Sequence, residues 1–377
     1  MKAVVVGGGL LGMLTARELS KSGVSVTLLE QGKMGRESSW AGGGILSPLY
    51  PWNYADSVNA LARWSQQQYP QLVSELIEEG GIDPQWTQSG LLVLDNDFSR
   101  ETDSSATLSR ATEWAREYGM ACEQLDGRAL REQEPELGPG LDPVHQLGLF
   151  FPEVAQVRNP RLIKSLQASC LKRGIQLVED SPVTDLLVSD SGSGARITGV
   201  KTEAMDYEAD VVVICAGAWS ARLLTRLNIE VPIKPMKGQM IMYRTSPGQI
   251  QRITLSDGHY VIPRRDGRVL VGSTLEDVGF EKSTSDEALL ELRQFAENLF
   301  PCLADAEIER QWSGLRPESP AGIPYICKVP GIEGLFLNTG HFRNGVVLAP
   351  ASVRLVTALI LGDKPILNPA DYGCARG

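Results

Sequence analysis

The sequence has few of the residues that bind metals or crosslink small secreted domains. It holds six cysteines in 377 residues, and none of them lies in a Cys-x-x-Cys pair. The three histidines, His145, His259 and His341, are far apart and show no ligand spacing. We therefore expect neither a metal site nor a disulfide framework, and we interpret the cysteines as thiols in a reducing compartment.

Positive charge and long apolar runs are also scarce. The net charge is −10 and no run of basic residues occurs, which argues against nucleic acid or an anionic membrane surface as a partner. The longest apolar stretch near the C-terminus, 345–361, is short for a membrane span and is interrupted by Pro350 and Arg354, so no transmembrane helix is expected. A strand that starts at about residue 3 leaves no room for a signal peptide. We expect a cytoplasmic protein that forms a homo-oligomer.

The first thirty residues predict a nucleotide-binding turn. A buried strand leads into Gly7-Gly8-Gly9-Leu10-Leu11-Gly12, a helix follows, and a second strand ends at Glu30. Gly7 permits the tight turn, Gly9 lets a pyrophosphate approach the backbone, and Gly12 lets the helix pack closely on the strand. The helix N-terminus would face the phosphates, and Glu30 would accept hydrogen bonds from an adenosine ribose. A plain βαβ unit is the alternative, and the motif alone does not separate FAD from NAD.

Two later segments repeat the order of strand, glycine turn and helix. The apolar run 210–215 is followed by Ala216 and Gly217, and the segment 337–345 has Gly340 at its turn. A helix N-terminus at the third turn would support an anionic flavin pyrimidine during reduction. Three such turns in this order favour FAD over NAD.

The remaining pattern predicts two domains, because a chain of this length is too long for one ordinary core. Helices are predicted at 57–80, 104–119, 160–173 and 345–361, and strands at 91–94, 174–188, 196–208, 210–215 and 334–338. Asn159 is a predicted N-cap with Pro160 at the first helical position, and 189–194 is a predicted polar turn. From 231 to 274 short alternating strands favour an antiparallel sheet in a second, α+β domain.

With these motifs the chain resembles a known family, the D-amino acid oxidase / glycine oxidase group of flavoproteins, over nearly its whole length. Within the group it resembles bacterial glycine oxidases of the ThiO type. The resemblance implies an α/β FAD-binding, Rossmann-like domain formed by 1–85, 150–230 and 316–377, and an α+β substrate domain with an antiparallel sheet formed by 86–149 and 231–315. The matching segments are 7–12 with Glu30, 38–46, 235–239, 260–267, 314–317 and 340–345.

The resemblance also implies the ligand-binding residues. The substrate carboxylate would meet Arg316, with Tyr260 beside it and Arg343 near the same end. Beyond the flavin, no catalytic side chain is implied. FAD would be held by Gly7, Gly9, Leu10, Leu11, Gly12, Glu30, Gln31, Ser38, Ser39, Gly43, Gly44, Ile45, Val183, Ala216, Gly217, His341, Phe342, Arg343, Asn344, Gly345, Val346 and Val347.

Departures from the superfamily pattern refine this prediction. Related sarcosine oxidases can carry a flavin-linked cysteine shortly before the segment that corresponds to Ser319-Pro320. This chain has Trp312-Ser313-Gly314-Leu315-Arg316 there, so non-covalent FAD is expected. Leu275 and Gly258 are expected as pocket neighbours that shift the preference among small amines.

The implied activity is oxidative deamination of glycine and other small primary or secondary amines, such as sarcosine and small D-amino acids. Hydride would pass to flavin, dioxygen would give hydrogen peroxide, and the imine would hydrolyse to glyoxylate and ammonia; thiamine thiazole biosynthesis is the implied pathway. A D-amino acid or sarcosine dehydrogenase that uses a carrier is the alternative. A non-catalytic partner protein on a flavoprotein scaffold is a further one, against which the intact pair of Arg316 and Tyr260 argues.

Each site residue also has a structural alternative. Arg316 would form an ion pair, Tyr260 would be a half-buried strand aromatic, and Arg343 would serve the helix or the flavin. His341 is interpreted as a turn residue.

Overall fold

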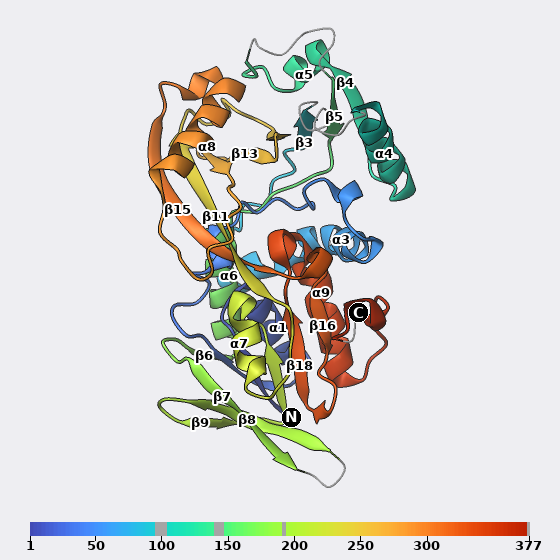
Figure 1. Ribbon diagram of the computed structural model, residues 1–377, viewed down its shortest axis with the longest axis vertical. Helices are drawn as coiled ribbons and strands as arrows, with labels where there is room; N and C mark the ends of the chain where they lie inside the picture. Colours follow the sequence, from blue (N-terminus) through green and yellow to red (C-terminus); the bar gives the residue numbers. More distant parts are fainter. Residues whose placement is uncertain (95–103, 139–146, 191–193, 375–377) are drawn as a thin grey trace.

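The computed structural model describes residues 1–94, 104–138, 147–190 and 194–374. Within these ranges the strands form three sheets (Figure 1). The first sheet has the order β16-β18-β10-β1-β2-β6, and its pairs are parallel except for β16 with β18. Its strands are β16 (Tyr325–Lys328), β18 (Leu335–Thr339), β10 (Val211–Ile214), β1 (Lys2–Val6), β2 (Ser25–Leu29) and β6 (Gln176–Val178).

Both faces of this sheet are covered, which explains its continuous apolar strands. Alternate residues of β1 point to opposite faces, so Val5 joins one core cluster while Val4 and Val6 join another. The cluster around Val5 includes buried side chains from four helices: α1 (Leu10–Lys21), α3 (Asp56–Gly80), α6 (Asn159–Lys172) and α9 (Gly345–Leu361). The other cluster contains α7 (Ser220–Thr225) and a small sheet of β17 (Ile332–Glu333), β8 (Ala195–Thr202), β7 (Val183–Asp190) and β9 (Asp206–Glu208).

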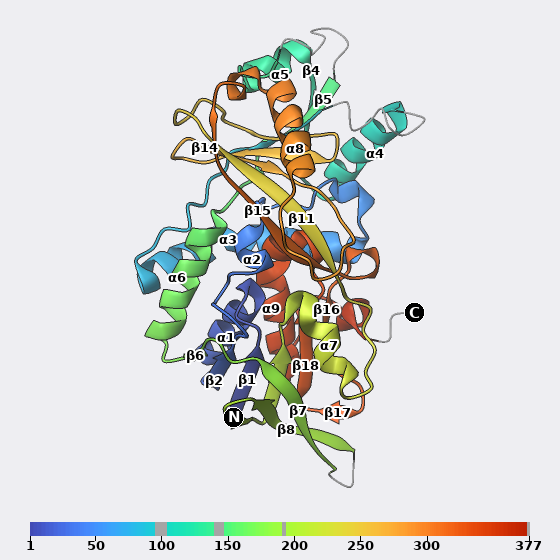
Figure 2. The same ribbon diagram turned by 60° about the vertical axis from the view of Figure 1, so that its left-hand side comes forward.

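A large second sheet lies above the first unit in Figure 1, in the order β15-β11-β14-β13-β12-β3-β5-β4. Figure 2 shows its long strands β11 and β15 running down toward the helices of the first unit. The strands are β15 (Glu307–Glu318), β11 (Lys234–Arg244), β14 (Arg268–Gly272), β13 (His259–Pro263), β12 (Ile253–Ser256), β3 (Leu91–Leu94), β5 (Leu147–Phe151) and β4 (Glu123–Asp126). The short helix α2 (Ser38–Ala41) and the helices α4 (Ser104–Glu117), α5 (Gly127–Gln133) and α8 (Asp286–Leu299) complete the fold.

This architecture agrees with the predicted fold class of a parallel α/β unit plus a second unit built on an antiparallel sheet. The large sheet nevertheless contains one parallel pair, β3 with β12. The predicted strand 174–188 is wrong as a single element, because Asp180 has φ +51° and the chain turns between β6 and β7. The strand predicted over 196–208 likewise forms two elements, β8 and β9. Residues 191–193 of the predicted turn 189–194 lie outside the described residues, and Ser189 and Asp190 belong to β7.

Asn159 is not the N-cap of α6. The cap is Arg158, and the Asn159 side-chain amide instead donates a hydrogen bond to the Ser39 carbonyl at 2.9 Å. The local pattern predicted that the Asn159 side chain caps its own helix. It makes a tertiary contact to the loop 38–44 instead. Pro160 is consequently the second residue of α6 and not the first.

The segment Phe342–Leu361 is long and apolar enough to cross a membrane by length and composition alone. In the structure 61% of its most apolar window is buried inside the protein, where α9 packs in the core cluster with α1 and α3. We therefore interpret α9 as a core helix of this fold, not as a membrane span.

Candidate functional site

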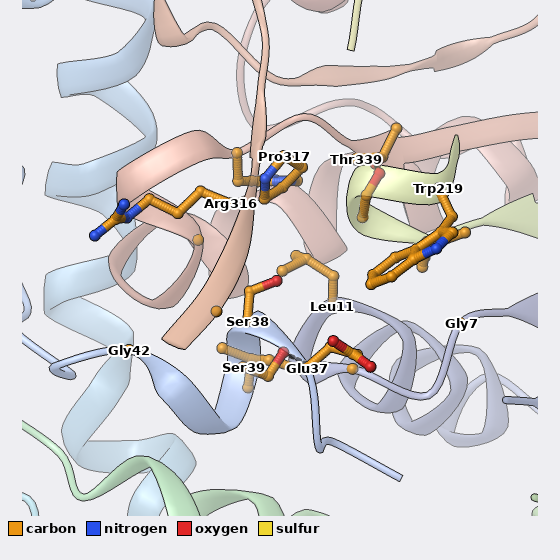
Figure 3. A pocket seen from close by; sticks show the side chains of 18 of the residues that line it. Gly7, Leu11, Glu37, Ser38, Ser39, Gly42, Trp219, Arg316, Pro317 and Thr339 are labelled. Carbon is orange, nitrogen blue, oxygen red and sulfur yellow. Dashed lines mark hydrogen bonds between the residues drawn. The ribbon is translucent and has the colours of Figure 1, made fainter. Parts of the chain in front are cut away.

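A cavity of about 350 Å³ runs between the carboxyl ends of the parallel strands and the large sheet. Strands β1, β10 and β18 are neighbours and run parallel, so the three glycine turns that follow them meet at one edge of the sheet. In Figure 3, Gly7 lies at one end of the cavity and Arg316 at the other, with Leu11 and Ser38 between them. The opening of an α/β sheet at this edge is where ligands bind in such folds.

The first turn has the backbone that its glycines predict. Gly7 has φ +110°, and a Cβ there would lie 2.4 Å from the Cys215 carbonyl oxygen, so only glycine fits between the first and second turns. Gly12 faces away from the cavity, and a Cβ on it would lie 1.8 Å from the Gly7 carbonyl oxygen. Gly12 therefore allows close packing of α1 on the turn and does not line the cavity.

Glu30 closes the same end of the cavity. Its carboxylate accepts hydrogen bonds from the backbone amides of Gly8 at 2.7 Å and Gly32 at 2.9 Å. Burial raises the pKa of Glu30, and those amide hydrogen bonds oppose that rise. The side chain is buried yet lines the cavity, so its oxygens remain within reach of a ligand there.

Two helix N-termini point at the cavity. Gly9 is the N-cap of α1 and Asn344 is the N-cap of α9, and neither provides a side-chain cap or is followed by an acidic residue in the first turn. Gly9 and Leu10 line the cavity at one end, and Gly345 and Val346 line it at the other. The positive ends of both helix dipoles are thus available to anionic groups of a ligand.

The loop that contains Gly42, Gly43 and Gly44 is held in place by a buried arginine. Arg264 donates hydrogen bonds to the Gly43 carbonyl at 2.6 Å and the Val157 carbonyl at 3.1 Å. Burial lowers the pKa of Arg264 to about 9, and the nearby positive charge of Arg158 contributes to the lowering. The arginine joins β13 of the large sheet to the cavity wall.

Arg316, on β15, faces the cavity from the large sheet. Its guanidinium donates hydrogen bonds to the Ser273 hydroxyl at 2.7 Å and the Thr274 carbonyl at 3.2 Å. Its depth in the protein lowers the pKa, an effect that the nearby Tyr260 opposes and Arg343 reinforces. The side chain is half-buried only because the cavity opens onto it. No carboxylate lies within ion-pair distance of Arg316 in the described part of the chain, which argues against the ion-pair alternative.

The guanidinium of Arg316 lies against the backbone of Gly238 on the neighbouring strand β11. A Cβ on Gly238 would lie 2.1 Å from both terminal nitrogens. Glycine at this position is therefore required by the close approach of the arginine, not by backbone torsion.

Tyr260 and Arg343 reach the same cavity. Tyr260 is buried, with its hydroxyl 3.7 Å from the Met240 sulfur, and its ring packs over Gly43 and Gly272. Arg343 belongs to the turn before α9 and makes no ion pair with the residues that the structure describes.

His341 is held neutral beside this turn. Its Nε2 lies 2.9 Å from the Ser352 hydroxyl, which is also within hydrogen-bond distance of the Leu348 carbonyl. Burial lowers the pKa of His341 to about 3. The imidazole is therefore neutral at neutral pH and is not a proton carrier there.

The structure brings most of the predicted site residues to one cavity. Three predicted cofactor residues, Gly12, Asn344 and Val347, do not line it. Asn344 is buried with neither side-chain polar atom hydrogen-bonded to the described residues. The predicted pocket neighbours Leu275 and Gly258 are not in the lining either; Leu275 is 53% exposed and nothing lies within 4 Å of a Cβ built on Gly258. The predicted residues in the lining are Gly7, Gly9, Leu10, Leu11, Glu30, Gln31, Ser38, Ser39, Gly43, Gly44, Ile45, Val183, Ala216, Gly217, Tyr260, Arg316, His341, Phe342, Arg343, Gly345 and Val346.

Sequence reasoning missed residues that support Arg316. Gly238 and Ser273 lie far from Arg316 in the chain, and only the pairing of β11 with β14 and β15 brings them together. The segment 235–239 was a recognisable motif, but no local rule assigns its glycine to an arginine of another strand. Trp219 and Arg222, which also line the cavity, lie in the predicted second turn and helix without a predicted role.

The chain is similar to known proteins over nearly its whole length. A family model described as FAD dependent oxidoreductase (DAO) matches residues 2–359. The chain is 47% identical to a glycine oxidase of Pseudomonas aeruginosa over 99% of this chain and 98% of that protein. It is 29% identical to a bifunctional protein ThiO/ThiG of Trichormus variabilis, over 98% of this chain and 54% of that protein. The crystal structure of glycine oxidase from Geobacillus kaustophilus superposes with a TM-score of 0.91 at 30% identity, over 100% of this chain and 98% of that one.

The family is FAD-dependent, and the residues of this chain fit such a cofactor. A Cβ on Gly9 would lie 2.9 Å from the Ser39 hydroxyl, so the glycine keeps the cavity open where the first helix begins. Cys215 also lines the cavity, and its Sγ lies 3.9 Å from the Thr15 hydroxyl on α1. The matching model, the close relatives and the shared fold show that the chain belongs to the DAO family of FAD-dependent oxidoreductases.

Proposed function

We propose that this enzyme oxidises glycine and other small primary or secondary amines that carry a carboxylate, such as sarcosine and small D-amino acids. The observation that carries the proposal is Arg316, a cavity-facing guanidinium whose described hydrogen bonds go to neutral oxygens only. Its position opposite the nucleotide-binding turn matches the substrate end of a flavin site. The similarity to glycine oxidases supports glycine as the substrate.

The chain contributes orientation to this reaction. The planar guanidinium of Arg316 binds a carboxylate through two parallel hydrogen bonds, which fixes both the position and the direction of the substrate. Tyr260 lies near it, contacts Met240 and lines the cavity together with that residue, which would favour a small substrate. Arg343 adds positive charge at the same end. Bound FAD supplies the redox chemistry by accepting a hydride from the substrate Cα.

Proton transfer does not require a side chain at this end of the cavity. Among the described lining residues the carboxylates are Glu30 and Glu37. Glu30 belongs to the nucleotide-binding turn, and Glu37 is paired with Lys282 at 3.0 Å. We propose that the substrate amine loses its proton to solvent before oxidation, so that the chain positions an already neutral amine.

We further propose dioxygen as the electron acceptor, with hydrogen peroxide as one product. Hydrolysis of the imine would then give glyoxylate and ammonia. The similarity to a ThiO/ThiG protein supports a role in thiamine thiazole biosynthesis. In this proposal 1–85, 150–230 and 316–377 form the FAD domain, and 86–149 and 231–315 form the substrate domain.

A substrate panel tests the proposal. Purified protein is mixed in air with glycine, sarcosine, D-alanine or ethylamine, and peroxide is measured. We expect peroxide with the three carboxylate-bearing amines and much less with ethylamine. Turnover with a dye acceptor but not with dioxygen would instead establish a dehydrogenase. Flavin that no amine of the panel reduces would contradict the proposed substrate class.

A further inference from the structure

The C-terminal segment folds back onto the edge strand of the first sheet and brings two cysteines into contact. Cys374 Sγ lies 2.9 Å from Cys327 Sγ of β16, and both residues carry thiols. These positions are 47 residues apart in sequence.

The contact does not depend on the sulfur atoms for its position. A short 3-10 helix, Pro369–Tyr372, precedes Cys374 and is capped by Asn368. Tyr372 is buried and donates a hydrogen bond to the Ser57 carbonyl at 2.8 Å. Core packing and hydrogen bonding therefore hold the tail in place, and the thiols meet as a consequence.

The two sulfurs differ in access, which suits a stepwise oxidation. Cys327 is buried in the core cluster around β10, whereas Cys374 is partly exposed and packs against the same cluster. An oxidant reaches Cys374 first, and Cys327 is already in contact to resolve the product.

The other four cysteines lack such an arrangement. Burial raises the pKa of Cys122 to about 11 and the pKa values of Cys170, Cys215 and Cys302 to about 12. They therefore stay protonated near neutral pH, and a protonated thiol reacts slowly with peroxide.

We propose that Cys327 and Cys374 form a peroxide-responsive, reversible disulfide that fastens the C-terminal segment to β16. In the first step the Cys374 thiol reduces one hydrogen peroxide molecule, which gives a sulfenic acid and one water. In the second step the Cys327 thiol attacks that sulfur, so the S–S bond forms and the hydroxyl leaves as water with the thiol proton. The peroxide can be added from outside or come from the enzyme's own turnover, and only the second source rests on the proposed function.

The position of the crosslink links it to the cofactor site. The loop between Cys327 and Cys374 contains β18, the turn with His341 and Arg343, and α9, which together form one wall of the cavity. A bond that closes this loop restricts the unfolded chain and so raises stability. Oxidation is therefore expected to raise the thermal midpoint of the segment that borders the flavin.

The test uses holoenzyme that has been reduced and freed of reductant, then treated with hydrogen peroxide without any amine. We expect a linked pair of Cys327 and Cys374 peptides in a non-reduced digest, a loss of two titratable thiols, and a higher thermal midpoint, all reversed by dithiothreitol. Cys374→Ser and Cys327→Ser should abolish the linked peptide and the shift. Cys302→Ser is the matched control and should keep both.

Both thiols remaining open to alkylation after peroxide treatment of wild-type protein would overturn the proposal. So would a sulfonic acid at Cys374 without any linked peptide. A second arm replaces added peroxide with glycine turnover, with and without catalase. Linkage by added peroxide but not by turnover would support the disulfide and count against the proposed oxidase activity, so the two failures are distinguishable.

Discussion

Alanine at Gly238 tests how the substrate arginine is positioned. The Cβ of Gly238→Ala would lie 2.1 Å from both terminal nitrogens of Arg316 and 2.3 Å from Cζ. The guanidinium must therefore move by about 1 Å, a misplacement that can cost about a hundredfold in rate. The movement also breaks the 2.7 Å hydrogen bond to Ser273. We expect kcat/KM for glycine to fall by roughly one hundredfold.

The fold should survive this change, because Gly238 lies in a regular strand and lacks a positive φ. The assay measures kcat/KM for glycine together with the flavin spectrum and the thermal midpoint. Gly373→Ala, whose Cβ meets its nearest neighbour at 3.6 Å, is the control. In an Arg316→Ala background the same change should add nothing. A Gly238→Ala enzyme with unchanged kcat/KM, or an additive double variant, would refute the reasoning.

Three further predictions concern the cofactor and pH. Acid precipitation should release all flavin into the supernatant, and colour retained by the denatured protein would disprove a non-covalent cofactor. Glu30→Ala should weaken FAD binding about tenfold or more without changing substrate preference, because charge-assisted hydrogen bonds are worth roughly 1.5–3 kcal/mol. An unchanged FAD affinity would exclude Glu30 from the site. His341 accepts a proton near pH 6.5 when unfolded but only near pH 3 when folded. The unfolded state thus binds more protons between these pH values, so the free energy of unfolding falls as pH falls, by about 2 kcal/mol from pH 7 to 5. In urea titrations His341→Gln should lose that part of the pH dependence. Parallel stability-versus-pH curves for the wild type and the variant would contradict the prediction.

Local patterns predicted the parts of the fold that local physics determines. The helix 345–361 follows from a largely apolar segment, and α9 has those bounds. The glycine turn at Gly7 follows from its φ of +110°, a torsion that glycine adopts readily. Its close approach to Cys215 on the second turn is not visible in the adjacent residues.

The remainder depends on contacts between distant segments. The parallel pairing of β3 with β12 joins strands about 160 residues apart, and short apolar strands carry no signal for their partner. Asn159 binds Ser39 and not its own helix, because loop 38–44 packs there. The stacking of Arg316 on Gly238 and the contact of Cys327 with Cys374 likewise appear only once the strands are paired.

The central claim is that Arg316 anchors the substrate carboxylate. The most direct measurement is the anaerobic rate of flavin reduction, compared between wild type, Arg316→Ala and Arg316→Lys, with glycine and with ethylamine. We expect both variants to lose rate and affinity for glycine, since lysine keeps the charge but lacks the planar fork. Loss of a charged hydrogen-bond pair of roughly 1.5–3 kcal/mol corresponds to about 10- to 150-fold. Ethylamine, which has no carboxylate, should be little affected. An equal loss for glycine and ethylamine would contradict the account and make Arg343 the better candidate.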